Sequence, residues 1–201
     1  MHDPSSYPAV RLAAEPDDAS VIANSRDQPE WFSVIFDRYF TAIHRYAAAR
    51  LGPGAADDVA AETFLAAFDQ RDRYDLTRPE ARAWLYGIAT NLIGRHRRGE
   101  LRLYRALSRS AARDDVEGRV EGHADRVTDR VTAEQLSPRL ARGLESLSRG
   151  DRDALMLVAC ADLSYAEVAF ALNIPIGTVG SRVNRARAKL RRTLGHAAEG
   201  I

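Results

Sequence analysis

Residues 163–192, LSYAEVAFALNIPIGTVGSRVNRARAKLRR, contain two helical patterns separated by a short break. The first pattern places one apolar stripe on a helix face, formed by Tyr165, Val168, Ala169 and Leu172. The break runs from Asn173 to Gly177 and holds Pro175, which disfavours the helical conformation in the residue before it. The second pattern carries a matching stripe of Val179, Val183, Ala186 and Leu190. Two short helices joined by a few turn residues predict a helix-turn-helix.

The outer face of the second helix is dense in positive charge. From Gly180 to Arg192 the sequence has six cations and no acid. Solvated helix faces normally mix both signs, so this face indicates a polyanionic partner. Arg and Asn bind guanine and adenine edges in the major groove. The alternative is a basic, solvated C-terminal helix. The residues expected on the DNA-facing side and its flanks are Ser181, Arg182, Asn184, Arg185, Arg187, Ala188, Lys189, Arg191 and Arg192.

Charge is unevenly distributed along the 201 residues, although the net charge is only +1. Residues 137–192 hold ten basic and five acidic side chains, whereas residues 29–98 hold ten basic and nine acidic ones. This asymmetry fits a DNA-binding C-terminal domain attached to a near-neutral body, and the length allows one or two domains.

Cysteine usage and apolar runs indicate the compartment. Cys160 is the only cysteine, so no disulfide can form within the chain, and a reducing compartment is expected. We expect Cys160 to be a small buried side chain. The longest apolar run is far shorter than a membrane span, and the N-terminus lacks a signal-peptide pattern. The sequence therefore predicts a cytoplasmic protein with no membrane insertion.

The first half of the chain begins with an acidic segment, residues 1–28, that lacks a sustained period and is predicted to be a flexible extension. A helix is expected from about residue 30 to Leu51, ended by glycines and a proline, and a second helix from about residue 55 to residue 70. The second helix carries Asp57, Asp58 and Glu62 near its start. Such acids either stabilise the helix start or form a docking face for a basic partner, and the spacing leaves both interpretations open.

The charged loop RDRYDLTRPE, residues 71–80, holds Tyr74 near its centre. The helix expected after it, residues 81–98, ends in the basic run RHRR. Cations are favourable at a helix C-terminus by themselves. However, aromatic stacking combined with phosphate contacts is also how proteins hold single-stranded nucleic acid, so the loop and the basic run together suggest that partner.

No segment has the two-residue period of a strand, so the fold class is predicted to be all-α. We expect two small helical domains joined by a flexible charged linker, with the helix-turn-helix in the C-terminal domain. The expected boundaries are a front domain at 29–107, a linker at 108–135, a last domain at 136–194 and a tail at 195–201.

Three motifs give the chain a resemblance to the extracytoplasmic-function sigma factors of bacterial RNA polymerase, within the sigma-70 family. DVAAETFL at 58–65 resembles the family's core-binding helix, and AWLYGIATNL at 83–92 is similar to the helix of its promoter-melting domain. YAEVA at 165–169 with PIGTVGSR at 175–182 resembles its −35-binding motif. The three motifs occur in the family's order, with a charged linker between the second and the third.

The resemblance implies a role for each of these regions. The acidic helix would dock on core RNA polymerase, chiefly on the β′ subunit with β also in contact, through Asp57, Asp58, Ala61 and Glu62. The front domain would bind the −10 element of promoter DNA, where the 71–80 loop would capture a flipped base, through Arg71, Tyr74, Asn91, Arg95 and Arg98. The last domain would bind the −35 element through Ser181, Arg182, Asn184, Arg185 and Ala188, and its phosphates through Arg187, Lys189 and Arg191. An anti-sigma factor is an expected further partner.

Two positions depart from the family pattern. Ala61 stands where many members have Gln, and Gly180 stands where Lys or Arg is usual. Each departure removes a possible polar contact, with polymerase at Ala61 and with −35 DNA at Gly180.

Two other function classes are weighed against this interpretation. A DNA recombinase would need a catalytic domain, yet the five histidines and Cys160 show no metal-ligand spacing, and no Gly-rich phosphate loop is present. No cofactor or catalytic residue is expected. A stand-alone helix-turn-helix regulator would need a sensory or dimerising domain in place of a polymerase-binding surface. We expect the free protein to bind duplex DNA poorly, because a mobile linker separates its two DNA-contacting domains.

Overall fold

The computed structural model describes residues 16–114 and 138–195. Within these ranges all regular structure is helical, which confirms the all-α prediction. The front half contains α1 (Asp18–Asn24), the 3-10 turn η1 (Pro29–Trp31), α2 (Phe32–Leu51), α3 (Pro53–Asp69), the 3-10 turn η2 (Arg71–Arg73), α4 (Arg82–Arg95) and α5 (Arg97–Asp114). The second half contains α6 (Pro138–Ser146), α7 (Arg149–Ala159), α8 (Tyr165–Leu172) and α9 (Ile176–Gly195).

Helix α1 overturns part of the prediction for residues 1–28. Asp17 caps this helix by accepting a 2.7 Å hydrogen bond from the backbone N–H of Ser20. The carboxylate of Asp18 is buried and accepts hydrogen bonds from Arg38 at 2.8 Å, Tyr39 at 2.6 Å and the Ala81 N–H at 2.7 Å. The prediction of a flexible extension is therefore wrong from residue 17 onward, because the hydrogen bonds of Asp18 hold this segment against α2 and the start of α4. Residues 1–15 lie outside the described ranges.

The helix boundaries around α2 and α3 follow the expected turn chemistry. Gly52 ends α2 with a positive φ of 83°, a conformation that glycine adopts without steric cost, and Pro53 opens α3 at its first position. The two helices pack side by side, and their aromatic side chains meet in the pairs Phe32–Phe68 and Phe36–Phe64, with 5.4 and 5.0 Å between ring centroids.

The helix predicted at 81–98 is two helices in the structure. α4 ends at Arg95, His96 interrupts it, and α5 starts at Arg97 and continues to Asp114, beyond residue 107, where the front domain was expected to end. Glu100 in the first turn of α5 is buried and bonds to Arg50 of α2. The first residues of the predicted linker, 108–114, are thus helical, while 115–135 and the tail from 196 lie outside the described residues.

The helix-turn-helix prediction is confirmed. Ser164 and Glu167 form a reciprocal capping box at the start of α8, and Asn173 ends that helix in the left-handed conformation. Val168 of α8 and Val179, Val183 and Ala186 of α9 are all buried, as the apolar stripes predict. Helix α7 packs against both of these helices.

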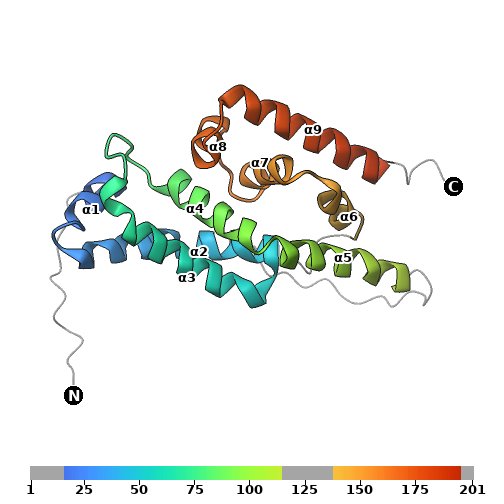
Figure 1. Cartoon of the computed structure of the whole chain (residues 1–201), viewed down its shortest axis with the longest axis horizontal. Helices are drawn as coiled ribbons and strands as arrows, with labels where there is room; N and C mark the ends of the chain where they lie inside the picture. The colour runs from blue at the N-terminus through green and yellow to red at the C-terminus, as the bar shows by residue number, and fades with distance from the viewer. Residues whose placement is uncertain (1–15, 115–137, 196–201) are drawn as a thin grey trace, which may run out of the picture.

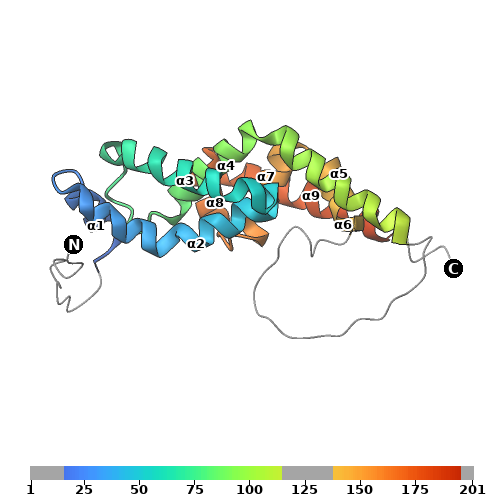
Figure 2. The ribbon, with the colours of Figure 1, turned by 90° about the horizontal axis from the view of Figure 1, so that it is seen from below.

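The two halves pack against each other along α4 and α5. Helix α8 lies on α4, and α6 lies on α5. Figure 1 shows α4 and α5 running through the middle of the molecule, with α2 and α3 on one side and α6–α9 on the other. Figure 2 shows the same stacking from below, with α7, α8 and α9 behind α4 and α5. The front half and the helix-turn-helix half therefore share a continuous interface.

Candidate functional site

The basic face of α9 is accessible over most of its length. Ser181, Asn184, Arg185, Arg187, Lys189 and Arg191 are exposed, and Arg182 and Ala188 are half-buried. The buried stripe of the same helix turns toward α7 and α8. Helix α9 thus presents the cations and small side chains predicted to read the −35 element on the side away from its core.

Three of these basic side chains are oriented by the α6–α7 region. Nη2 of Arg185 donates to Oδ1 of Asp151 at 2.9 Å, and Nζ of Lys189 donates to the carbonyl oxygen of Ser146. Arg182 lies over Gly150, where an added Cβ would come within 2.9 Å of its guanidinium carbon. Partial burial is the largest single effect on Asp151 and raises its pKa, but the hydrogen bonds from Arg185 and Ser148 and the charges of Arg185 and Arg182 together outweigh it, so the pKa of Asp151 lies below its ordinary value. The Asp151 pairing restricts the Arg185 rotamers while most of that side chain stays exposed, at 62%.

The residues predicted to contact the −10 element fall into two groups. Asn91, Arg95 and Arg98 are exposed on α4 and on the start of α5. Arg71 instead donates to the carbonyl oxygen of Phe68 at 2.7 Å and stacks over the Phe68 ring, with 3.9 Å between its guanidinium carbon and the ring centroid.

Tyr74 is also directed inward, with only 5% of the residue exposed. Its ring packs against Trp84 with 4.9 Å between centroids, and its hydroxyl donates to the carbonyl oxygen of Arg78 at 2.9 Å. Burial raises the pKa of Tyr74 well above its ordinary value, so the hydroxyl stays protonated as a donor. In this arrangement Arg71 and Tyr74 hold the loop in shape, and no part of the Tyr74 ring faces outward to stack on a base.

The acidic side chains of α3 share one exposed face. Asp57, Asp58, Ala61 and Glu62 are all exposed, while Val59, Ala60, Thr63 and Phe64 of the same helix are buried. Oδ1 of Asp57 lies 3.0 Å from Nε2 of His44 on α2. None of these acids is needed to cap α3, since the helix begins with Pro53 and has no side-chain cap. Helix capping therefore does not explain why these positions of α3 are acidic.

An apolar patch beside this face was missed by the sequence analysis. Leu65 follows the acids along the same exposed stripe and is 63% exposed. On the adjoining α2, Phe36 is 40% exposed and packs on Phe40 and Phe64, with ring centroids 4.8 and 5.0 Å away. Periodicity alone assigns Phe36 to the core, because it falls at helical spacing with buried residues. Exposed apolar side chains rimmed by charges are typical of a protein-binding surface.

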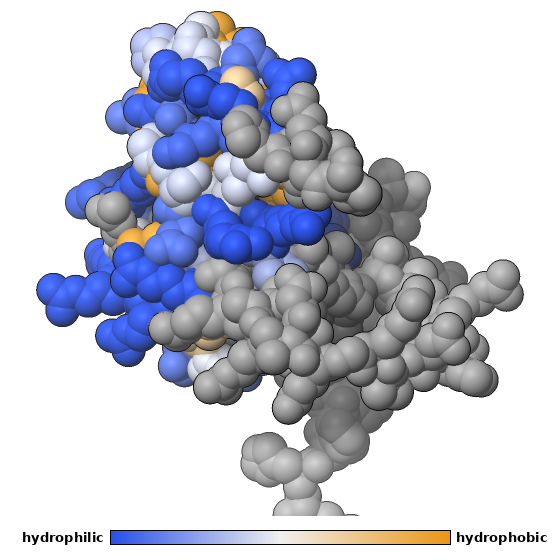
Figure 3. All heavy atoms as spheres, turned by 90° about the vertical axis from the view of Figure 1, so that its right-hand side faces the viewer, coloured by the Kyte–Doolittle hydropathy of each residue, from blue (hydrophilic) through white to orange (hydrophobic). Residues whose placement is uncertain are grey.

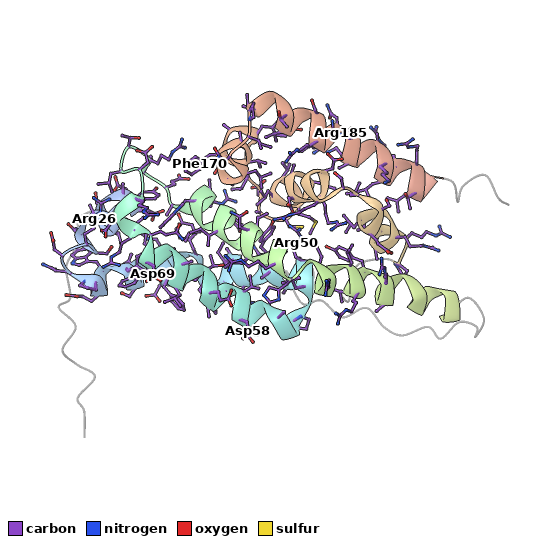
Figure 4. The ribbon with its side chains drawn as sticks, viewed as in Figure 1. Arg26, Arg50, Asp58, Asp69, Phe170 and Arg185 are labelled. Atoms are coloured by element: carbon purple, nitrogen blue, oxygen red, sulfur yellow. The ribbon has the colours of Figure 1, made fainter. Side chains whose placement is uncertain are left out.

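The acidic and basic faces lie on opposite sides of the molecule. Figure 4 shows Asp58 and Asp69 on α3 at one side and Arg185 on α9 at the other, with α4 between them. Figure 3 looks onto the end where α5 and α9 finish, and its described side chains are mostly hydrophilic. The two faces could accordingly hold a basic protein surface and DNA at the same time.

Other site chemistry is limited in the ranges that the structure describes. No group of three or more His, Cys, Asp or Glu residues is placed to hold a metal ion there. Cys160 is half-buried, and burial raises the pKa of its thiol. Among the helices of residues 16–114 and 138–195, none is long and apolar enough to cross a membrane.

Comparison with known proteins identifies relatives of both halves. Residues 35–103 match the family model for sigma-70 region 2, and residues 137–190 match that for sigma-70 region 4. ECF RNA polymerase sigma factor SigC of Mycobacterium tuberculosis is 33% identical over 148 residues, which are 74% of this chain and 75% of SigC. ECF RNA polymerase sigma factor SigW of Bacillus subtilis is 32% identical over 168 residues, 81% of this chain and 88% of SigW.

Solved structures show the same fold. CnrH in complex with the cytosolic domain of CnrY superposes with a TM-score of 0.60 at 27% identity, covering 89% of this chain and 97% of CnrH. The sigma factor RpoE of Bartonella quintana, solved with the anti-sigma factor NepR, superposes with a TM-score of 0.56 at 23% identity, covering 82% of this chain and 96% of RpoE.

Proposed function

Since the chain belongs to the sigma-70 family, in its extracytoplasmic-function group, we propose that α3 binds core RNA polymerase while α9 and the α4 region read the promoter. The chain is a sigma factor that directs transcription initiation at promoters. This family consists of sigma factors, which are not enzymes, and family membership separates the chain from a stand-alone regulator and from a recombinase.

The polymerase-binding surface in this proposal is the exposed face of α3 with Asp57, Asp58, Ala61 and Glu62. Leu65 and Phe36 extend it with apolar area that would be buried on docking. The acids favour a basic partner surface and raise the rate of encounter, and the apolar side chains contribute affinity by leaving water. The β′ subunit is the proposed main partner, with β as a second contact.

The DNA-binding surfaces divide the promoter between the two halves. The −35 element would lie along α9, where Ser181, Asn184 and Arg185 reach the bases and the outer cations reach the phosphates. The −10 region would bind Asn91, Arg95 and Arg98. Arg71 and Tyr74 would act on DNA indirectly, by shaping the loop, which their packing inside the front half supports.

One observation carries this proposal: the acidic and the basic faces point in opposite directions from a shared helical body. A protein that bridges polymerase and DNA needs two surfaces that do not compete for the same side. A regulator that binds DNA unaided has no need of an exposed acidic and apolar face on α3.

The proposal is tested by run-off transcription with core RNA polymerase on a library of genomic fragments. We expect initiation at a specific subset of promoters only when the protein is present. Tight sequence-specific binding of the free protein without any effect on core polymerase would overturn it.

We also propose an anti-sigma factor as a regulating partner and a cytoplasmic location. The CnrH structure, which contains the cytosolic domain of CnrY, supports the partner because the same fold accommodates a second chain. Affinity purification from native cells is expected to recover a protein that inhibits run-off transcription when it is added back. Recovery of polymerase subunits alone would contradict this partner.

A further inference from the structure

Helix α1 is bound to the C-terminal end of the 71–80 loop. The backbone N–H of Asp18 donates to the carbonyl oxygen of Pro79 at 3.0 Å, and the Asp18 carboxylate accepts from the N–H of Ala81 at 2.7 Å. The same carboxylate is buried and also accepts hydrogen bonds from two side chains of α2. The first residue of α1 thus fixes the point at which the loop passes into α4.

Arg26, which follows α1 in the sequence, holds the other end of the loop. Its Nη2 lies 3.3, 3.2 and 3.5 Å from the carbonyl oxygens of Arg71, Asp72 and Tyr74. In the opposite direction, Nε of Arg71 donates to the carbonyl oxygen of Ser25 at 3.2 Å. Figure 4 shows Arg26 beyond the end of α1, close to the start of the loop. A rigid guanidinium meets several carbonyl oxygens only while the backbone keeps this curvature, so Arg26 fixes the path of the chain where the loop begins.

The centre of the loop is exposed between these two attachments. Asp75, Leu76 and Thr77 are all exposed. Oδ1 of Asp75 accepts from the N–H of Thr77 at 3.1 Å and from its hydroxyl at 2.7 Å, which folds this part of the chain into a turn. The loop therefore presents a compact, exposed tip while both of its ends are bound to α1 and its flanking residues.

Helix α1 is itself held firmly between the two attachments. Its seven residues span about 10 Å at the helical rise of about 1.5 Å per residue. Val21 and Ile22 are fully buried, and α1 packs against α2. A fixed element that binds both ends of a loop reduces the number of conformations open to that loop. The separation and direction of the loop ends thus depend on α1.

We infer that Asp18 and Arg26 are positioning residues, through which α1 sets the shape of the 71–80 loop for its contact with the −10 element. Asp18 is buried and the Arg26 guanidinium is directed at carbonyl oxygens, so both act through the loop and not on DNA. A loop whose ends are released no longer holds one shape, and its discrimination between the correct −10 base and a wrong one falls. The inference rests on the proposed function of the front half at the −10 element.

Three variants of the full chain test this role. Arg26→Ala removes the donors at the start of the loop. Asp18→Asn keeps the shape of the side chain but removes its charge and one acceptor oxygen at the end of the loop. The Arg26 side chain is 32% exposed, so Arg26→Ala keeps the test available if the buried change at Asp18 prevents folding. Asp27→Ala is the matched control, because Asp27 is an exposed charged residue next to Arg26 in the sequence.

The first measurement is backbone hydrogen exchange of the free protein, followed by mass spectrometry. Exchange rates report local opening, and loss of a hydrogen bond to a charged group changes such an equilibrium by about tenfold or more. We expect exchange in peptides covering residues 71–81 to become about tenfold faster in Arg26→Ala and Asp18→Asn, with unchanged exchange in α9. Asp27→Ala should match the wild type. Unchanged exchange of residues 71–81 in both variants would overturn the attachment of the loop to α1.

The second measurement is promoter discrimination by each protein bound to core polymerase. Run-off transcription is compared between a promoter that the wild type uses and versions with one −10 base or one −35 base replaced, and each result is expressed as a ratio. One wrong base weakens a specific complex by about fivefold or more. We expect Arg26→Ala and Asp18→Asn to lower the ratio to below about twofold at one or more −10 positions, and to keep the −35 ratios. A smaller folded fraction would lower initiation on every template alike and leave all ratios unchanged.

Faster exchange with unchanged −10 ratios would overturn the positioning role and leave α1 as a brace that only stabilises the fold. Equal loss of −10 and −35 discrimination would also overturn it, because the effect would not be confined to the loop. A wild-type protein that directs no initiation with core polymerase would refute the proposed function, and with it the promoter role of α1. Initiation by the wild type with unchanged ratios in the variants would refute the role of α1 alone.

Discussion

Replacement of Glu100 by glutamine is expected to destabilise the folded protein by about 3–5 kcal/mol, the cost of removing one partner from a buried charge pair. The Glu100 carboxylate accepts from Nε of Arg50 at 2.5 Å and from Nη1 of Arg152 at 3.1 Å, and these side chains are 1–3% exposed. Glutamine keeps the shape but offers one acceptor oxygen, and its NH2 group faces a guanidinium donor. Arg50 then keeps Asp153, whereas Arg152 keeps only the backbone carbonyl oxygens of Leu144, Glu145 and Leu147, so one buried guanidinium is left without a carboxylate partner.

Urea unfolding followed by far-UV circular dichroism measures this loss. With a slope of about 2–3 kcal/mol per M, the unfolding midpoint should fall by about 1–2.5 M. Glu145→Gln is the matched control, since Glu145 pairs with Arg105 at 2.7 Å while these side chains are 27% and 57% exposed. A pair this exposed contributes about 0–1 kcal/mol. Equal midpoints for the two variants would refute the conclusion that the buried network stabilises the packed halves.

Four further predictions address individual surfaces. Asp58→Lys should weaken binding to core polymerase in a competition assay while leaving −35 duplex binding unchanged, and equal loss of both would point to misfolding. Arg185→Ala should weaken binding to a −35 duplex by about 1–3 kcal/mol if Arg185 contacts a base in bidentate fashion, whereas uniform weakening across all −35 variants would identify a phosphate contact. Tyr74→Phe should lower the unfolding free energy by about 0.5–1.5 kcal/mol, because it removes a hydrogen bond to a backbone carbonyl; a loss of promoter opening with stability unchanged would instead indicate a direct DNA contact. Folding lowers the pKa of Asp151 from 3.8, so the stability that its carboxylate contributes is fully present above pH 3.8 and is lost as the pH falls through the pKa of the folded state. Asp151→Asn should therefore make the unfolding free energy depend less on pH in this acidic range. An unchanged pH dependence would contradict the pairing of Asp151 with Arg185.

The apolar periodicity of the chain was sufficient to locate the helix-turn-helix and the exposed acids of α3. Val179, Val183 and Ala186 are buried at the predicted positions, and Asp58 and Glu62 are exposed as a solvent face requires. A helix has a fixed angular repeat, so the side on which a residue lies follows from its position once the helix is known.

Residues whose roles depend on distant partners were not predictable in this way. Asp18 belongs to a segment that sequence reasoning assigned to a flexible extension, yet it binds residues 20, 21 and 63 positions further along the chain. Tyr74 is an aromatic residue in a charged loop, a pattern typical of nucleic-acid contacts, but its ring is packed on Trp84. A local sequence pattern indicates which interactions a side chain is able to make. It does not indicate which distant residue the side chain contacts in the folded protein.

The sequence by itself therefore determined the helical class, the family, and which helix faces are basic or acidic, because these properties depend on local spacing and charge. Only the tertiary structure decided that Arg50 pairs with Asp153 across 103 residues and that Phe170 meets Arg78. Such contacts depend on how the two halves of the chain pack against each other. The complementary shape and the buried charges at their interface produce no periodic pattern in the sequence, so the sequence does not predict them. Gly87 shows the difference in one residue: in the sequence it is a weak point in a helix, and in the structure it is where α8 and α4 meet.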